Sequence, residues 1–191
     1  FQVVVERGEF DVAKQLNKLR QYAGATDIAG VALSVVDAEN AAIPREMARL
    51  QKAGIKVVTI DSDVNRETAR DSRFAYLGTD NVVAGRELGT AAKTLLPDGG
   101  KYVTFVGVKT AANAKERIGG FAEGAGEKLT SAENLGDGGK PAEARVNVRE
   151  ALNRNADTKV LVGIWSYNTP AIIDIVKQLN SRETLKIVGC D

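Results

Sequence analysis

The stretch AGIKVVTIDSD at residues 53–63 combines a helix stop, a strand and a polar turn. Gly54 follows the helical spacing of residues 41–53, and glycine is the usual residue just after a helix. Residues 57–60 are then almost continuously apolar or β-branched, which is typical of a strand buried on both faces. Three polar residues come directly after it. A helix, a buried strand and a polar strand end in this order indicate a parallel α/β sheet.

The same alternation runs along the rest of the chain. Apolar, β-branched runs predict strands at residues 2–5, 31–35, 57–60, 74–77, 102–106, 160–164 and 186–188. Apolar spacing at i, i+4 and i+7 predicts helices around residues 12–19, 41–53, 84–95, 114–125, 144–151 and 172–179. LPDGG at residues 96–100 and GDGGKP at residues 136–141 are turns or loops. This alternation of strands and helices predicts an α/β doubly wound fold.

The composition is that of an ordinary globular protein. Of 191 residues, 43% are hydrophobic and 27% charged, and the net charge is +1. This balance argues against nucleic-acid binding, which concentrates Lys and Arg. With no His and one Cys, the chain lacks a His general base, a Ser-His-Asp triad, a zinc site and an internal disulfide. No apolar run approaches the roughly 20 residues of a membrane helix, and no signal-peptide pattern is present.

Polar and aromatic side chains follow several predicted strands, where open α/β sheets bind their ligands. They are Asp61, Ser62, Asp63, Thr79, Asp80, Asn81, Asn113, Arg117, Trp165, Ser166, Tyr167, Asn168 and Asp191. Carboxylates accept hydrogen bonds from hydroxyls, Arg donates them, and Asn does both. An aromatic face covers the apolar C–H face of a sugar ring. The set therefore suits a neutral polyol.

Each of these residues also has a purely structural interpretation. Asp, Asn and Ser after a strand often cap helices or form turns, most plainly Asp63 and residues 80–81. Arg117 falls in the first turns of a striped helix, as a surface arginine would, and Trp165 follows a buried strand, as a core residue would. Asp61 and Asp63 follow the same predicted strand. Two carboxylates placed in this way more often have separate roles than form an acid–base pair or a metal site. No glycine-rich nucleotide motif is present, so we expect no cofactor.

Four segments are similar to the periplasmic sugar-binding proteins of ABC importers, of the ribose- and galactose-binding type. They are residues 53–63; YLGTDN at 76–81 with AGR at 84–86; NAKERIGGF at 113–121; and WSYN at 165–168 with IVGCD at 187–191. The resemblance implies two doubly wound, Rossmann-like parallel-sheet lobes of a type I periplasmic binding protein. Residues 1–80 would form part of the N-terminal lobe and residues 81–191 most of the C-terminal lobe, with a crossover near residues 79–85.

The resemblance also implies which residues bind the ligand. The expected set is Asp61, Asn113, Arg117, Asn168, Asp191, Trp165 and Tyr167. The first five would hydrogen-bond sugar hydroxyls, and the two aromatic residues would contact the ring. Two positions depart from the family: Ser62 stands where ribose binders tend to have Arg, which argues against ribose itself. Cys190 stands where an aromatic residue is usual, an altered contact for which Trp165 or Tyr167 would compensate.

The function implied is recognition without catalysis. The protein would be the solute-binding component of an ABC sugar importer, a monomer in the periplasm or lipid-anchored outside the cytoplasm. It would bind a neutral monosaccharide or polyol between two lobes and dock on a membrane permease. Family members begin before residues 2–5 and continue beyond Asp191, so this chain resembles the middle of a longer protein. We therefore expect residues 1–191 alone to bind sugar weakly.

Two other functions stay open on the same scaffold. One is the effector-binding core of a lactose-repressor-type transcription regulator, which shares the fold and would carry a DNA-binding helix pair upstream. The other is a sugar-modifying enzyme, for which the sequence offers no pair of nucleophile and base.

Overall fold

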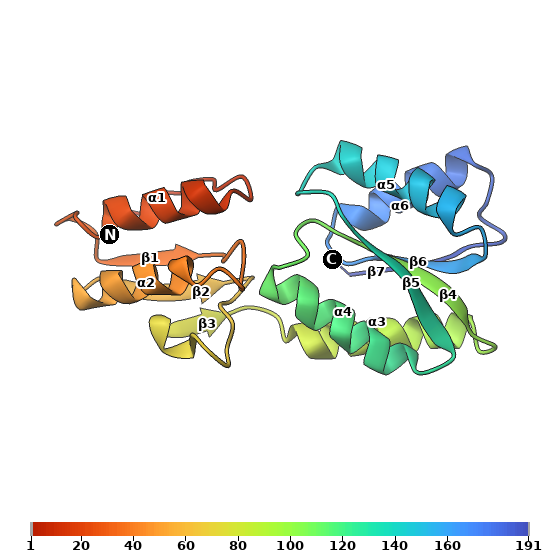
Figure 1. Ribbon diagram of the computed structural model, residues 1–191, viewed down its shortest axis with the longest axis horizontal. Helices are drawn as coiled ribbons and strands as arrows, with labels where there is room; N and C mark the ends of the chain where they lie inside the picture. The colour runs from red at the N-terminus through yellow and green to blue at the C-terminus, as the bar shows by residue number, and fades with distance from the viewer. Residues whose placement is uncertain (1, 191) are drawn as a thin grey trace. The chain divides into compact units, whose positions relative to one another are not determined.

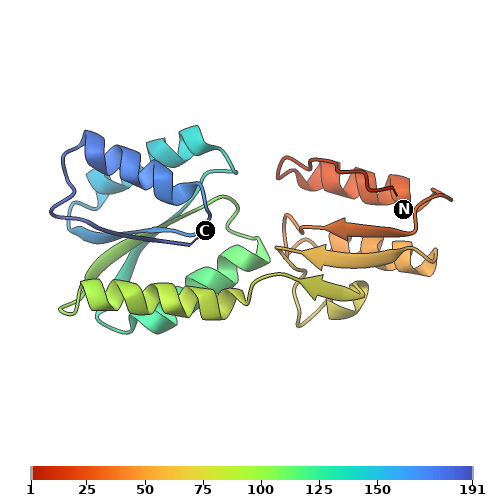
Figure 2. The same ribbon diagram turned by 180° about the vertical axis from the view of Figure 1, so that it is seen from behind.

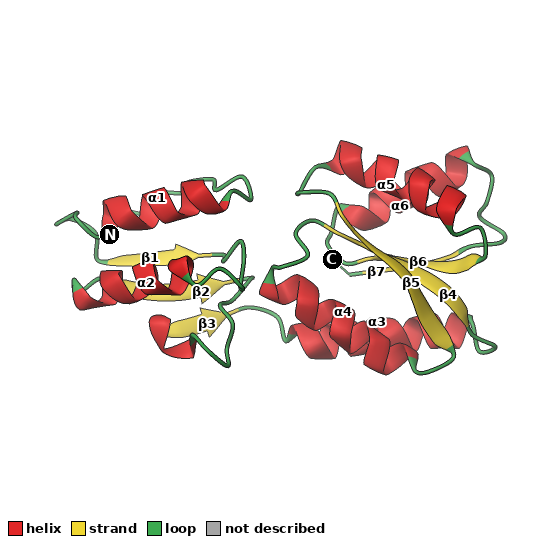
Figure 3. Ribbon diagram, in the orientation of Figure 1, coloured by secondary structure: helices red, strands yellow, loops and turns green. Residues whose placement is uncertain are grey.

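The computed structural model describes residues 2–190 and divides into two compact units. Unit 1 holds the residues up to Gly78 together with Thr110–Ala112, and unit 2 holds Thr79–Lys109 and the residues from Asn113 onward. Both units are parallel sheets whose strands alternate with helices, so the expected α/β fold class is confirmed (Figures 1 and 3). Among the helices of residues 2–190, none has the length and apolar character needed to cross a bilayer.

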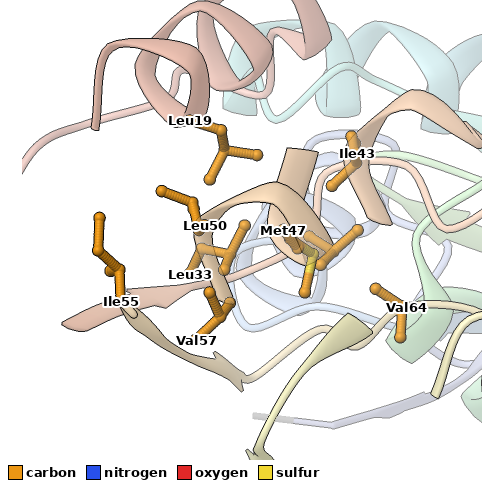
Figure 4. Close-up of a cluster of buried hydrophobic side chains, with 9 residues drawn as sticks. Leu19, Leu33, Ile43, Met47, Leu50, Ile55, Val57 and Val64 are labelled. Atoms are coloured by element: carbon orange, nitrogen blue, oxygen red, sulfur yellow. The ribbon is translucent and has the colours of Figure 1, made fainter. Parts of the chain in front are cut away.

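In unit 1, three parallel strands pair in the order β1–β2–β3. The elements are α1 (Val12–Tyr22), β1 (Gly30–Leu33), α2 (Ala42–Lys52), β2 (Lys56–Ile60), the 3-10 helix η1 (Arg70–Ser72) and β3 (Ala75–Leu77). Gly54, with φ +84, follows α2 as predicted. Buried side chains from both helices, from β1 and β2 and from the loops beside these strands form one core (Figure 4): Leu19, Leu33, Val35, Ile43, Met47, Leu50, Ile55, Val57 and Val64. On the other face of the sheet, Ile60 and Leu77 remain exposed.

The strand predicted at residues 2–5 is wrong. These residues have no regular secondary structure, and Val3, Val4 and Val5 are 83%, 73% and 87% exposed. A strand is held by hydrogen bonds to a neighbouring strand. No described strand pairs with this valine run. The valine run favours an extended backbone, but an extended segment becomes a strand only where a neighbouring strand pairs with it.

In unit 2, four parallel strands pair in the order β5–β4–β6–β7. The elements are α3 (Asn81–Leu95), β4 (Gly100–Val106), α4 (Ala112–Ala125), β5 (Leu129–Gly136), α5 (Pro141–Arg154), β6 (Thr158–Gly163), α6 (Asn168–Gln178) and β7 (Lys186–Gly189). Figures 1 and 2 show α3 and α4 on one face of this sheet and α5 and α6 on the other. Alternate residues of β4 therefore meet opposite layers: the Tyr102 ring contacts Phe121 of α4 at 4.8 Å between centroids, whereas Phe105 packs with α5 and α6.

The sequence analysis missed β5. This strand, LTSAENLG, lies at the edge of the sheet, and only its first residue, Leu129, is buried. An edge strand pairs on one side and tolerates polar side chains, so it lacks the continuous apolar run that predicted the inner strands.

Helices α3 and α4 contact each other through their backbones. Each carries two glycines four residues apart, Gly85 and Gly89 in α3 and Gly120 and Gly124 in α4. A Cβ at Gly85 would lie 2.1 Å from the backbone oxygen of Arg117, and a Cβ at the other three would lie 2.0 to 2.2 Å from a backbone oxygen of the facing helix. No real side chain fits at these distances. The four glycines therefore set the spacing of the two helices.

Unit 1 has a buried charge cluster at the end of β2. The guanidinium of Arg73 donates to both carboxylate oxygens of Asp63 at 2.6 Å, the Thr59 hydroxyl donates at 2.6 Å, and the Val64 N–H donates at 2.9 Å. Burial alone would raise the pKa of Asp63, but these hydrogen bonds and the charge of Arg73 together hold that pKa below its usual range. Asp63 is thus a structural residue of this loop.

We predict that Gly120→Ala destabilises the protein whereas Gly119→Ala does not. Gly120 faces the α3 backbone, so an added methyl group forces the helices apart. We expect this to lower the free energy of unfolding by about 2 kcal/mol. Gly119 has no atom within 4 Å of a built Cβ, and alanine favours helix there by less than about 1 kcal/mol. Urea unfolding of both variants measures the difference. Equal stability would contradict the close backbone contact.

We predict that Asp63→Asn lowers the free energy of unfolding at pH 7 by about 3 kcal/mol, because Arg73 loses its buried partner. The folded pKa of Asp63 is depressed, so its stabilisation is complete above the unfolded pKa and is lost as the pH falls. The gap between wild type and variant should therefore narrow below about pH 4. Urea unfolding from pH 7 to pH 3 tests this, with the exposed Asp71→Asn as control. A gap independent of pH would refute the assignment.

Candidate ligand-binding site

Asp61 is the predicted site residue that lies in unit 1, directly after β2. Its φ is +59, and the Ser62 N–H donates to the Ile60 carbonyl at 2.6 Å, so Asp61 occupies the apex of a γ-turn. Asp tolerates this left-handed backbone better than most residues. Its exposed carboxylate accepts a hydrogen bond from the Ser34 hydroxyl at 3.0 Å, just beyond the end of β1. The turn thus holds a solvent-accessible carboxylate at the carboxyl edge of the sheet.

Arg117 lies in α4 of unit 2 and is only 7% exposed. Its Nε donates to the Asn81 Oδ1 at 2.8 Å, and its Nη1 donates to the Ile164 carbonyl at 3.0 Å. The surface-arginine interpretation is therefore wrong. Asn81, at the start of α3, also donates to Glu116 at 3.2 Å. The sequence analysis missed this supporting role because a polar residue after a strand looks the same whether it forms a turn or holds a distant side chain.

The segment after β6 surrounds a buried carboxylate, Asp137, which is 6% exposed. The Tyr167 hydroxyl donates to it, as do the Asn168 Nδ2 and the Gly139 N–H, both at 2.9 Å. The Asn168 Oδ1 accepts from the Trp165 N–H at 3.0 Å, and Asn168 is 0% exposed. Burial, and the hydrogen bond to Asp137, raise the pKa of Tyr167. The sequence analysis placed Asp137 in a glycine-rich loop and assigned it no role.

The rings of Trp165 and Tyr167 meet edge to face, with centroids 6.4 Å apart. A Cβ at Gly107, after β4, would lie 1.9 Å from the Trp165 ring, so the ring lies directly on the Gly107 backbone. The Gly107 carbonyl accepts from the Gly138 N–H at 2.9 Å. The loops after β4, β5 and β6 therefore support the two aromatic side chains together.

Asn113 is 4% exposed and lies one helical turn before Arg117 in α4. Cys190 follows β7, and its N–H donates to the Gly163 carbonyl at 3.0 Å. Burial raises the pKa of the Cys190 thiol, and the charge of Arg117 opposes this rise. Asp191 lies outside the described residues.

Unit 2 thus gathers a guanidinium, amides, a phenol and an indole near the carboxyl ends of β4, β6 and β7. These groups donate and accept hydrogen bonds and offer ring faces, the contacts that a hydroxyl-rich ligand uses. Among residues 2–190, no three His, Cys, Asp or Glu side chains gather in a way that would hold a metal ion. The arrangement is suited to binding. That the seven predicted residues contact a ligand stays a prediction.

Comparison with solved structures shows similarity to ABC transporter solute-binding proteins. One from Agrobacterium vitis with bound D-fucose is 25% identical with a TM-score of 0.86, over 96% of this chain and 63% of that chain. One from Mycobacterium smegmatis with bound glycerol is 25% identical with a TM-score of 0.78, over 92% of this chain and 59% of that chain. One from Burkholderia graminis in complex with D-arabinose, 24% identical with a TM-score of 0.80, covers 92% and 60% and shows the fold alone.

The chain thus spans less than two thirds of the length of these three proteins. A search of curated proteins gave no match. A family model described as the periplasmic binding protein domain matches residues 1–191. Since this match covers the whole chain and both units have the parallel α/β fold, the protein belongs to the periplasmic binding protein domain family, as the sequence resemblance predicted.

Proposed function

We propose that the protein is the sugar-binding component of an ABC importer and binds a neutral monosaccharide or a related polyol. The observation that carries this proposal is the buried guanidinium of Arg117 at a strand-end edge, held by Asn81 and by the Ile164 carbonyl. These two bonds engage two of the five N–H donors of an arginine. The remaining donors suit ligand hydroxyl oxygens. Solute-binding relatives with bound D-fucose and glycerol support a hydroxyl-rich ligand.

The proposed ligand-binding residues are Asp61, Asn113, Arg117, Asn168, Asp191, Trp165 and Tyr167. Asp61 would accept from ligand hydroxyls, because its γ-turn leaves the carboxylate exposed. The rings of Trp165 and Tyr167 would cover the C–H face of the sugar. The Asn168 amide is buried and already hydrogen-bonded at both ends, to the Trp165 N–H and to the Asp137 carboxylate.

The remaining parts of the proposal rest on family membership. Residues 1–80 would belong to the N-terminal lobe and residues 81–191 to the C-terminal lobe, and the lobes would close on the sugar. The partner would be a membrane permease, with the protein a monomer in the periplasm or lipid-anchored outside the cytoplasm. The relatives are solute-binding proteins rather than enzymes, and none of the comparisons supports the transcription regulator.

We predict that a neutral sugar binds the protein expressed from its complete reading frame with 1:1 stoichiometry. Calorimetry with the neutral sugars D-fucose, D-arabinose and D-ribose measures this binding, and the anionic D-glucuronate serves as the charged comparison. Arg117→Lys should weaken this binding by about tenfold or more, because lysine cannot reproduce the forked hydrogen bonds of the guanidinium. The control is Arg86→Lys, since Arg86 pairs with Glu123 on the surface. The proposal fails if no neutral sugar binds or if Arg117→Lys retains full affinity.

We predict that Gly107→Ala shifts the fluorescence of Trp165, the single tryptophan, to longer wavelength in the sugar-free protein. The added methyl group would occupy the space of the indole ring and push it toward solvent. The same variant should weaken sugar binding. Gly119→Ala, where a Cβ meets no atom within 4 Å, should leave emission and affinity unchanged. An unchanged spectrum for Gly107→Ala would rule out this contact.

A further inference from the structure

We propose that Asp137 is the positioning residue of the segment from Trp165 to Asn168. Its carboxylate determines which way the Asn168 amide faces, and through that amide it fixes the backbone that carries Trp165 and Tyr167. The consequence for sugar affinity rests on the proposed function. The positioning itself does not, because it is built into the sugar-free protein.

The argument begins with the hydrogen-bond roles of the two buried side chains. An ionised carboxylate only accepts hydrogen bonds, so the part of the Asn168 amide that faces Asp137 must be its NH₂ group. This contact joins the Asn168 Nδ2 to the Asp137 Oδ2 at 2.9 Å. At the other end of the amide, the Trp165 N–H only donates, and it meets the Asn168 Oδ1 at 3.0 Å. Both ends of the amide are therefore dictated.

The carboxylate is itself fixed to the sheet. The Asp137 N–H lies 3.0 Å from the carbonyl oxygen of Val106 and 3.2 Å from that of Gly107, both at the end of β4. Its Oδ1 accepts from the Gly139 N–H at 2.9 Å and from the Tyr167 hydroxyl. Asp137 thus transmits the position of the sheet to the segment after β6, as a buried supporting residue does in a preorganised site.

Helix capping does not explain Asp137. Helix α5 begins at Pro141, its N-cap is Lys140, and the cap makes no side-chain hydrogen bond. The Asp137 carboxylate instead receives two donors from residues about 30 positions further along the chain, Tyr167 and Asn168.

Replacement by the isosteric amide distinguishes orientation from mere space filling. In Asp137→Asn, the new NH₂ group faces either the Asn168 NH₂ group or the Gly139 N–H. Turning Asn168 over would place its NH₂ group against the Trp165 N–H. Every arrangement therefore leaves a buried donor facing a donor, at a cost comparable to an unsatisfied polar group.

Exchanging the two side chains removes this conflict. In the double variant Asp137→Asn with Asn168→Asp, the carboxylate at position 168 accepts from the Trp165 N–H and from the new amide. The Oδ1 of that amide still accepts from Tyr167 and Gly139. All the hydrogen bonds of the wild-type network are restored with the two residues exchanged.

The test compares wild type, Asp137→Asn, Asn168→Asp and the double variant by Trp165 emission, near-ultraviolet circular dichroism and thermal melting without sugar. We expect each single variant to shift the emission and the double variant to return it to the wild-type wavelength. The control is Asp174→Asn, an aspartate of α6 paired with Arg145 at the surface, which should leave the emission unchanged.

Wild-type emission in Asp137→Asn would overturn the proposal, as would a double variant that is unfolded or no closer to wild type than the single variants. If Asp137→Asn does not fold, the double variant alone decides, because only the exchange restores the network. Sugar titration of the folded proteins is a separate readout, in which Asp137→Asn should lose about tenfold in affinity. If wild type binds no sugar, the proposed function fails, and the sugar-free spectra still decide the role of Asp137.

Discussion

The main-chain contact between α3 and α4 is the constraint on which the arrangement of unit 2 depends. Gly85 lies against the carbonyl of Arg117, so the spacing of the two helices also fixes the backbone that carries the guanidinium. Asn81, one turn earlier in α3, and the Ile164 carbonyl then hold that guanidinium from two sides. A side chain held in this way loses little conformational freedom when it binds a ligand. The four glycines of α3 and α4 therefore also determine where the Arg117 guanidinium lies at the end of β6.

The two units present their polar groups by different means. In unit 1 a γ-turn leaves Asp61 exposed, whereas the neighbouring Asp63 is buried and neutralised by Arg73. In unit 2 a second buried carboxylate, Asp137, joins the loops after β4, β5 and β6 and supports the aromatic pair. Both buried carboxylates hold other groups in place. The exposed carboxylate, Asp61, is the one that we propose accepts hydrogen bonds from a ligand.

Local signals predicted much of the fold. The helix stop at Gly54 and the inner strands were confirmed, because a left-handed glycine and a continuous apolar run depend on the nearest residues alone. The wrong and missed strand predictions concern segments whose structure depends on pairing with another strand. Residues 2–5 have strand-like side chains but no partner, and β5 pairs at a sheet edge although its side chains are mostly polar. The sequence also indicated where site residues would gather, since the ends of parallel strands share an edge.

By itself, the sequence determined the α/β class, the family resemblance and the positions at which polar residues follow strands. Only the tertiary structure decided what each of those residues does. Asp61 and Asp63 are two positions apart and equally polar, yet Asp63 is buried against Arg73, ten residues away along the chain, whereas Asp61 is exposed. Asp137 and Asn168 acquire a joint role across about 30 residues in the same way. A side chain's function depends on its burial and its partners, and these come from segments that the fold alone brings together.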